Sequence, residues 1–434
     1  MKQQKSTQYR PFFLIILLPL IFLFSACADQ TVTINSGSDG TVYYQGARLI
    51  IGNGDVINDG TFSITNGVLV YVGSSDEVLI PDNSVSIDLS GMTVMPAIID
   101  SHAHLRTSRE NLTNDLRRRA EQGVSAVLSL GTDGIETPLE MRDEFNLGIA
   151  RYLSAGRGIT APEPGRTEVP HWVKNEEEAR QAVRDEATRN VDFIKIWVDD
   201  RAGQYEKLSP ELYAVIIEEA HLNGLQVGAH IFNLEDAKGL LLAGVDFFAH
   251  GVRDQDIDEE FIELVRQHPN VMLIANLPSR GVPTDLDWLA NYMTQDEFSL
   301  AQSANRERLE VQEAFGIQAR NLSRLNAIGM PIALGTDGNT FWAPHIEMED
   351  MVESGMSPSD VIIAATKNSA ALLGLDESGT IEVGKHADFI ILEGNPLDDI
   401  TNTRLICDIY LQGEALQGIK IQREGSLCPL TIIL

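Results

Sequence analysis

The sequence contains little cysteine, comparatively few basic residues and almost no long apolar runs. Three of its 434 residues are cysteine, and 33 Lys and Arg stand against 63 Asp and Glu, which gives a formal net charge of −30. A protein this acidic is repelled by nucleic acid and by anionic lipid headgroups, so we expect neither as a binding partner. Beyond residue 24 no apolar run is long enough to span a bilayer, which excludes a multi-span membrane protein. With 43% hydrophobic and 22% charged residues, the composition is typical of a globular protein.

The first 26 residues have the pattern of a secretory signal peptide. Lys2, Lys5 and Arg10 precede an apolar run over residues 12–24, and a basic segment followed by a short apolar one is typical of such signals. The run is too short for a membrane-spanning helix, and Pro19 interrupts it. We therefore exclude residues 1–26 from the fold and expect an exported protein.

The signal ends in the sequence FSAC, which resembles the bacterial lipobox. The resemblance implies that Cys27 is lipidated and anchors the exported protein to a bacterial membrane, with the small polar residues 27–40 as a tether. Phe24 stands where the lipobox usually has leucine, so a soluble secreted protein is the alternative. An exported location also permits a disulfide between Cys407 and Cys428, with two unpaired buried thiols as the alternative.

Short apolar runs alternate with turn residues from 41 to 94 and again from 376 to 434. Segments such as GTFSITNG and VLVYVGSS end in Asn-Gly or Ser-Ser, a pattern that predicts small antiparallel strands. The two regions flank the rest of the chain. We therefore expect them to pair in space as the two halves of one small β-sandwich-like domain.

The region between them, residues 95–375, alternates apolar runs with amphipathic helical stretches. This alternation is typical of a parallel sheet with crossover helices. Eight runs predict an α/β fold, a closed (β/α)8 TIM-type barrel. The runs cover residues 94–99, 124–130, 149–154, 193–198, 225–229, 245–249, 271–277 and 331–335. The long stretch 278–330 between the last two runs is a candidate lid.

Polar residues follow five of the eight predicted strands. His102 and His104 lie two positions apart, so on a strand both side chains point to one face. Alone, such a pair could equally be hydrogen-bonded histidines at a strand end. The ends of other strands carry Lys195, His230, His250 and Asp337. Barrel active sites are built where strand ends converge, and polar groups there need partners, so the six residues together predict a metal site.

Lys195 is the unusual member of this set. An isolated ammonium group between Ile194 and Ile196 is costly to bury, and it has no lone pair to give to a metal ion. An ion pair with Asp199 is the structural alternative to a role in a metal site.

Several segments, in their order along the chain, resemble the amidohydrolase superfamily. Within it they are similar to the branch of imidazolonepropionase and of prolidase-like enzymes such as Xaa-Pro dipeptidases. The segments are GARLIIGNG, MPAIIDSHAHL, VDFIKIWVDD, VGAHIFNLEDAKGLLLAGVDFFAHG, LGTDG and AATKNSAALLGLDESGTIEVGKHADFIILEGNPLDDI. The resemblance implies a metal-dependent hydrolase of carbon–nitrogen bonds that forms homo-oligomers.

The resemblance also implies a pair of divalent ions, zinc in the first place and manganese, cobalt or iron as alternatives. The implied ligands are His102, His104 and Asp337 for one ion, His230 and His250 for the other, and Lys195, carbamylated by carbon dioxide, as the bridge. A hydroxide shared by the two ions would attack the substrate carbonyl. Asp337 would act as the base and pass a proton to the leaving nitrogen.

Loops that follow the predicted strands carry four candidates for substrate binding, Arg157, His171, Arg253 and His345. The resemblance implies that His171 binds the substrate carbonyl. An arginine at the mouth of the barrel would suit a substrate carboxylate, which it can bind through two hydrogen bonds. A loop salt bridge or a surface position is the alternative for Arg157, Arg253 and His345.

The preferred function is cleavage of the C–N bond of a small amide. An Xaa-Pro dipeptidase or other dipeptidase is the nearest alternative, although Phe232 stands where prolidase-like relatives commonly carry a tyrosine. A lactone or ester hydrolase would use the same hydroxide. A metal-binding lipoprotein without catalysis is the remaining alternative, and Asp337 argues against it because a metal carrier needs no base.

Overall fold

The computed structural model describes residues 40–134, 137–144, 146, 148–416 and 428. The predicted signal peptide, Cys27 and nearly all of the tether lie outside the described residues. Among the described residues, no helix combines the length and the apolar character that a membrane span requires.

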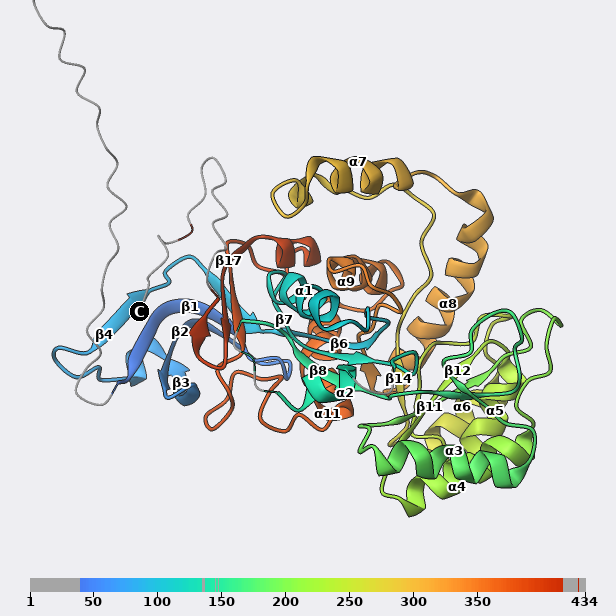
Figure 1. Cartoon of the computed structure of the whole chain (residues 1–434). Coiled ribbons are helices and arrows are strands. Elements are labelled where there is room, and N and C mark those ends of the chain that lie inside the picture. The colour runs from blue at the N-terminus through green and yellow to red at the C-terminus, as the bar shows by residue number, and fades with distance from the viewer. Residues whose placement is uncertain (1–39, 135–136, 145, 147, 417–427, 429–434) are drawn as a thin grey trace, which may run out of the picture.

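Segments from the two ends of the chain form one eight-stranded sheet (Figure 1). Its strand order is β18-β17-β16-β5-β1-β2-β3, with β4 beside β1. The strands are β1 (Val42–Ile50), β2 (Val56–Thr65), β3 (Val68–Ser74), β4 (Val85–Asp88), β5 (Thr93–Pro96), β16 (Phe389–Leu392), β17 (Ile406–Leu411) and β18 (Glu414–Ala415). Tyr44 stacks on Phe62 and Phe389 stacks on Tyr410, with ring centroids 4.7 and 4.6 Å apart. Aromatic pairs from both ends of the chain therefore build this core.

Eight parallel strands form the barrel. They are β6 (Ile98–Ala103), β7 (Val124–Ser129), β8 (Arg151–Ser154), β11 (Ile194–Val198), β12 (Val227–Ile231), β13 (Phe247–Phe248), β14 (Met272–Ile274) and β15 (Ile332–Ala333). Backbone hydrogen bonds of 2.9 Å from Ser101 to Leu334 and from Asp192 to Ser154 join the two sheets into which these strands divide. The predicted (β/α)8 barrel with a separate β domain is confirmed. Short strands β9 (Ile159–Thr160) and β10 (His171–Trp172) extend the sheet beside β11.

Helices cover the outside of the barrel. They are α1 (Arg109–Ala120), α2 (Thr137–Arg142), α3 (Glu176–Thr188), α4 (Pro210–Leu222), α5 (Leu234–Ala243), α6 (Glu259–Gln267), α7 (Gln295–Ala304), α8 (Leu309–Ala327), α9 (Ala343–Glu353), α10 (Pro358–Ile363) and α11 (Ser369–Leu372). Shorter elements are the 3₁₀ helices η1 (Ser75–Glu77), η2 (Asp287–Leu289) and η4 (Ile400–Arg404) and the π-helical segment η3 (Ala364–Asn368). Asn175, Ser209 and Asp258 cap α3, α4 and α6 by accepting a backbone N–H of the first turn.

The first predicted strand differs from the structure. Its residues 94–96 belong to β5 of the small sheet, and β6 of the barrel begins at Ile98, so His102 lies within the strand rather than after it. Residues 93–103 are buried throughout. A continuous apolar run gives no signal of the point where the chain crosses from one sheet to the next.

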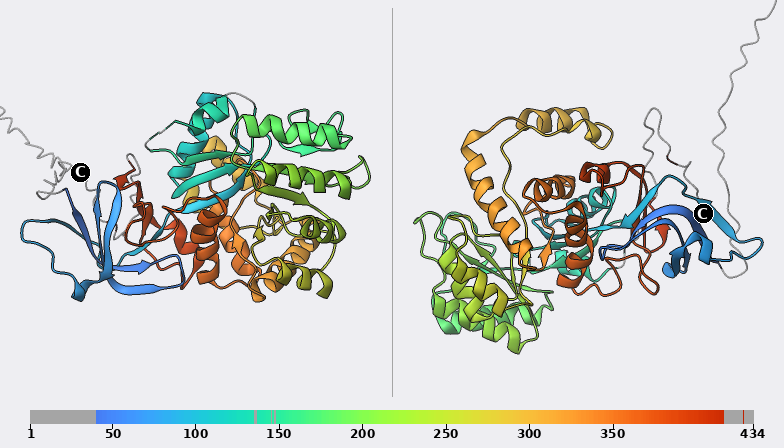
Figure 2. Two further views of the ribbon diagram at one scale, coloured as in Figure 1. Left: turned by 90° about the horizontal axis from the view of Figure 1, so that it is seen from below. Right: turned by 180° about the vertical axis from the view of Figure 1, so that it is seen from behind.

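The stretch 278–330, predicted as a lid, contains η2, α7 and α8. Near its end, Leu322 and Leu325 of α8 are buried against the barrel, whereas α7 has no buried residue. Arg118 of α1 forms an ion pair of 2.8 Å with Glu297 of α7. Figures 1 and 2 show α7 projecting beyond the other helices of the barrel. Motion of this segment over the barrel stays a prediction.

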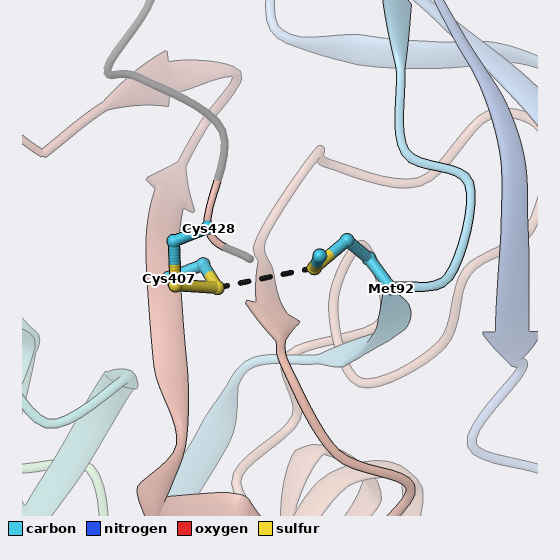
Figure 3. The surroundings of a disulfide bond; sticks show 3 residues. All are labelled: Met92, Cys407 and Cys428. Atoms are coloured by element: carbon cyan, nitrogen blue, oxygen red, sulfur yellow. Dashed lines mark hydrogen bonds between the residues drawn. A yellow bond between two sulfur atoms is a disulfide. The ribbon is translucent and has the colours of Figure 1, made fainter. Parts of the chain in front are cut away.

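Cys407 of β17 and Cys428 form a disulfide bond (Figure 3). The Sγ of Cys407 also lies 3.9 Å from the Sδ of Met92, so the bridge packs against the small sheet. Of the two alternatives that the sequence left open, the structure contains the bridge.

Replacing Cys428 by serine is expected to lower the free energy of unfolding by about 3 kcal/mol, because a 21-residue separation is then no longer closed in the unfolded chain. Urea unfolding measures this difference. The same comparison in a reducing buffer is the control, since both proteins should then unfold at one urea concentration. Equal midpoints without reductant would contradict the structural role of the bridge.

Candidate metal centre

Five barrel strands and the loops that follow them bring the six predicted residues together. Oδ1 of Asp337, which follows β15, lies 3.3 Å from Nε2 of His102 and 3.0 Å from Nε2 of His104. Oδ2 of the same carboxylate lies 3.7 Å from Nε2 of His250, which follows β13. The ring of His250 is 4.7 Å from the ring of His230 on β12, centroid to centroid. Four histidines and one carboxylate thus form a single cluster.

Potential ligand atoms of His102, His250 and Asp337 all lie within 4.8 Å of one another. One cation could therefore contact all three of these groups. The set of imidazole nitrogen and carboxylate oxygen atoms suits zinc and other divalent transition metals. The residues present thus fit a metal centre.

Each histidine of the cluster has one ring nitrogen held by a neighbouring group outside it. The pairs are His102 Nδ1 with the carbonyl of Ala249 (3.1 Å), His104 Nδ1 with Oγ1 of Thr132 (2.8 Å), His230 Nε2 with Oδ2 of Asp199 (3.0 Å) and His250 Nδ1 with the amide of Asn276. Such contacts fix the ring orientation of metal-binding histidines, and they leave the second nitrogen for the ion.

The protonation states also favour metal binding. Burial lowers the pKa of His230 to about 3, and it lowers the pKa values of His102 and His250 well below their ordinary range. These histidines are therefore neutral at pH 7, the form that donates a lone pair. Burial alone would raise the pKa of Asp337, but its contacts with His102 and His104 and the charge of Lys195 hold that pKa well below its ordinary value.

Lys195 is buried among these groups with 1% of its surface exposed. Its Nζ has no hydrogen-bond partner among the described residues, and the ion pair with Asp199 is not formed, since Asp199 instead contacts Arg201 at 2.6 Å. Burial lowers the pKa of Lys195 to about 7, and the nearby carboxylate of Asp337 offsets part of this effect. A glycine makes room for the side chain, because a Cβ on Gly131 would lie 2.7 Å from Cγ of Lys195.

The loop that carries Asp337 is held from behind by buried polar groups. Asp337 has a left-handed backbone with φ of 49°, which is uncommon for a residue other than glycine. Oδ2 of Asp100 accepts a hydrogen bond from Thr336 (2.8 Å), and Arg119 donates to the carbonyl of Gly338 (3.2 Å). Both Asp100 and Arg119 are fully buried. This support keeps an unfavourable backbone conformation in place at the site.

A cavity of about 280 Å³ opens onto the cluster. Its wall includes His104, Glu163, Arg166, Trp197, His230 and Asp337. The volume is at the lower end of that of small-molecule sites, so a compact substrate fits it.

The four predicted substrate-binding residues are placed differently from one another. Nε2 of His171 lies 2.7 Å from the buried carboxylate of Glu186, and Nε of Arg157 donates to the carbonyl of Val169. Each of these two side chains thus has a neighbouring partner, and their role in substrate binding stays a prediction. Arg253 faces the cluster, since its charge acts on Asp337 and Lys195, and its buried Nε has no hydrogen-bond partner among the described residues.

His345 lies apart from the cluster, in the packing between α9 and η4. Its side chain is buried, and its two nitrogens contact Oγ1 of Thr403 at 3.0 Å and the carbonyl of Gln122 at 3.1 Å. Both nitrogens are therefore occupied in a structural role. The position after β15 was a reasonable signal for the active site, but α9 turns this side chain into the core.

His345→Ala is expected to lower the free energy of unfolding by about 2–4 kcal/mol, because it leaves a cavity and two polar groups without partners. Bound metal should be unchanged.

Burial also lowers the pKa of His345 to about 3 in the folded chain, against 6.5 in the unfolded chain. Since the unfolded chain binds the proton first, His345 reduces stability as pH falls from about 6.5 towards 3. Urea unfolding of His345→Gln should accordingly show a weaker loss of stability over this pH range than the wild type, and an equal loss would contradict the assignment.

The sequence did not predict the three side chains that hold the histidines, which are Thr132, Asp199 and Asn276. Asn276 follows β14 with a left-handed φ of 45° and is buried. Asp199 was considered only as a partner of Lys195. A polar residue near the end of the seventh predicted strand was a usable signal for Asn276, because it occupies the same rim as the predicted ligands.

Residues 93–414 match the amidohydrolase family. The chain belongs to this family. It is 25% identical to ochratoxinase from Aspergillus niger over 87% of each chain, and 24% identical to imidazolonepropionase from Halobacterium salinarum over 82% of this chain and 92% of that protein. Among solved structures, it superposes on a protein from Bifidobacterium longum assigned as a prolidase with a TM-score of 0.73 and 28% identity, covering 89% of this chain and 96% of that one.

This amidohydrolase is therefore a hydrolase of carbon–nitrogen bonds, as members of the family are. The family assignment made from the sequence segments is confirmed.

Proposed function

We propose that this amidohydrolase holds two divalent metal ions and cleaves the amide bond of a small substrate. The observation that carries the proposal is the buried Nζ of Lys195, which has no hydrogen-bond partner among the described residues although it lies 5.4 Å from the ring of Trp197, close to the histidines and Asp337. A polar atom without a partner is costly in a protein interior. A bound group that contacts Lys195 and the histidines at once removes that cost.

In this proposal His102, His104 and Asp337 hold one ion, and His230 and His250 hold the other. The neutral histidines and the ionised carboxylate are the forms that bind zinc, with manganese, cobalt or iron as alternatives. Held by these residues, such ions would supply Lewis-acid chemistry, polarising a substrate carbonyl and activating water for attack.

Lys195 would serve as a carbamate that bridges the ions. With a pKa of about 7, a large fraction of its Nζ is neutral at physiological pH and carries a lone pair. That lone pair forms a bond to the carbon of carbon dioxide, and one proton leaves the nitrogen. The product is an anion with two oxygen atoms, which replaces an unpaired amine by a metal ligand.

Other residues of the cluster have further roles in the proposed reaction. Asp337 accepts the proton of the attacking water, since it is the carboxylate that opens onto the cavity with 33% of its side chain exposed. It passes this proton to the leaving nitrogen, which departs as a neutral amine. His102 and His250, almost fully buried, keep bulk water away from the other side of the cluster.

Small amides are the preferred substrates, and dipeptides, including those with a C-terminal proline, are the second candidate class. A protein assigned as a prolidase is among the structural neighbours, which favours a dipeptide. Phe232, where prolidase-like relatives commonly have a tyrosine, is 40% exposed and offers no hydroxyl to a dipeptide carboxylate. A lactone or ester would be attacked by the same route.

A panel of small amides, dipeptides and lactones tests the proposal. Hydrolysis should stop when a chelator removes the metal and should return when zinc, manganese or cobalt is added back. Turnover that survives complete metal removal would contradict the proposal. Metal binding without hydrolysis of any member of the panel would favour the non-catalytic alternative.

We also propose an exported protein anchored through lipid on Cys27 and assembled as a homo-oligomer. Mass spectrometry of the mature N-terminus tests the anchor. A diacylated Cys27 is expected in the wild type, and Cys27→Ser should release the protein from membranes. Mature chains that begin elsewhere than residue 27 would contradict the anchor.

A further inference from the structure

The loop after β11 brings two charged side chains to His230. Oδ2 of Asp199 lies 3.0 Å from Nε2 of His230 and 2.6 Å from Nη1 of Arg201. Nη1 of Arg201 and Nε2 of His230 are themselves 3.1 Å apart, and both lie within hydrogen-bond distance of this one oxygen. A carboxylate oxygen can only accept, so Nε2 of His230 carries the proton and Nδ1 keeps the lone pair.

This contact distinguishes His230 from the rest of the cluster. His102, His104 and His250 are held at Nδ1, whereas His230 alone is held at Nε2. Without the carboxylate of Asp199, the charged group nearest to Nε2 of His230 would be Nη1 of Arg201, a donor 3.1 Å away that would select the opposite tautomer. The carboxylate therefore determines which nitrogen this ligand offers to an ion.

Arg201 fixes Asp199 in turn. Its guanidinium donates to Oδ2 of Asp199 through Nη1 and to Oε1 of Glu163 through Nε, at 2.6 and 2.9 Å. The backbone is left-handed at Arg201 and again at Ala202, with φ of 55° and 59°. Two such residues in succession are strained, and strain of this kind persists at functional sites where the surrounding contacts hold it.

Asp199 and Arg201 together form a clamp on His230, and Glu163 connects this clamp to the wall of the cavity. It is almost completely buried, it lines the cavity, and it also accepts a hydrogen bond from Arg166 on the same wall. Arg201 and Arg166 thus share one carboxylate partner. Only Arg201 reaches Asp199 and His230, so the two arginines form a matched pair for an experiment.

We propose that Asp199 and Arg201 are positioning residues for the ion bound by His230 and His250. Asp199 holds His230 with Nδ1 free, and Arg201 holds Asp199 in place against the wall that carries Glu163. This inference rests on the proposed two-metal site. It predicts that the two ions differ in their dependence on this clamp, since His102, His104 and Asp337 do not contact it.

Competitive zinc titration of the full chain measures the affinity of each ion. Asp199→Asn, which removes the charge and keeps the size, should weaken one ion by about 10- to 100-fold and leave the other unchanged. Arg201→Gln should weaken the same ion by about 10-fold. Arg166→Gln, the matched control, should leave both affinities unchanged.

A spectroscopic signature separates positioning from a general loss of structure. With ¹⁵N-labelled histidine, the zinc-loaded wild type should show one of the four cluster rings with its proton on Nε2. In Asp199→Asn, the nitrogen signals of that ring alone should change. If Asp199→Asn does not fold, Arg201→Lys takes its place as the test. It keeps the positive charge but cannot contact Asp199 and Glu163 at once, so it should give the same change.

Two further results would overturn the inference. If the wild type binds two zinc ions and both variants bind them with wild-type affinity and unchanged histidine signals, Asp199 and Arg201 have no positioning role, although the proposed function stands. If the wild type binds fewer than two ions, the proposed two-metal site fails and the inference fails with it.

Discussion

Lys195→Ala is expected to release bound metal and to lower kcat/KM by more than about 10²-fold. Loss of a residue that only hydrogen-bonds to a metal ligand can already cause a decrease of that size. The reason is that the variant has no amine to carry the bridging carbamate. The histidines would then face each other without the shared anion. Metal content by mass spectrometry and hydrolysis rates, measured on the same preparation, test both effects.

Rescue gives this prediction its specificity. Short carboxylic acids such as formate or acetate fit the space left by the lysine side chain and supply two oxygen atoms. They should restore part of the metal content and part of the rate of Lys195→Ala. Lys207→Ala is a suitable control, because Lys207 pairs with Asp236 on the barrel surface and should neither lose metal nor respond to acetate. Full activity of Lys195→Ala without added acid would remove the bridging role.

Asp337→Asn is expected to lower kcat by about 10²–10⁴-fold, the range that general acid–base catalysis contributes. Asparagine keeps an oxygen atom towards His102 and His104 but cannot take up a proton at neutral pH. Substrate binding should change less than turnover, because the cavity wall is otherwise intact. Steady-state kinetics over a range of pH separate the two parameters.

The control for Asp337→Asn is a change behind the site. Thr336→Val removes the hydrogen bond to Asp100 and leaves the carboxylate of Asp337 in place. It should lower kcat by a smaller factor and keep the pH dependence of the wild type. Asp337→Asn with wild-type kcat and pH dependence would exclude this carboxylate as the base.

The barrel was predictable because each of its eight strands is a buried apolar run, and such runs carry their own signal. The start of the first barrel strand was harder to predict. Val94 and Ile98 belong to the same apolar run in the sequence, although they lie in different sheets. The pairing of β5 with β1 and with β16, the latter about 300 residues later, separates them. Such long-range pairing has no local signature.

The cluster was predictable for a related reason. His102, His230, His250 and Asp337 each follow an apolar run and Lys195 lies within one, and the closure of a barrel brings the ends of such runs to one rim. The contacts of the His345 and His171 side chains could not be predicted in this way. Their partners, such as Thr403 and Glu186, are set by helix packing and not by strand order.

The side chains that hold the histidines in place were the least predictable feature of the site. Asp199 lies four residues after Lys195, a spacing that suggested contact between the two. In the structure Lys195 points into the cluster, and Asp199 turns to His230 and Arg201 instead. A left-handed turn at Arg201 decides this outcome, and a turn of that kind at a residue other than glycine has a weak signal in the sequence.

The most direct test of the two-metal site is diffraction from crystals of the zinc-loaded protein at the zinc absorption edge. Two anomalous peaks per chain are expected, one beside His102, His104 and Asp337 and one beside His230 and His250, with continuous density between the peaks and Nζ of Lys195. Crystals that give no anomalous peak at this cluster, together with elemental analysis that finds no stoichiometric transition metal, would contradict the two-metal site.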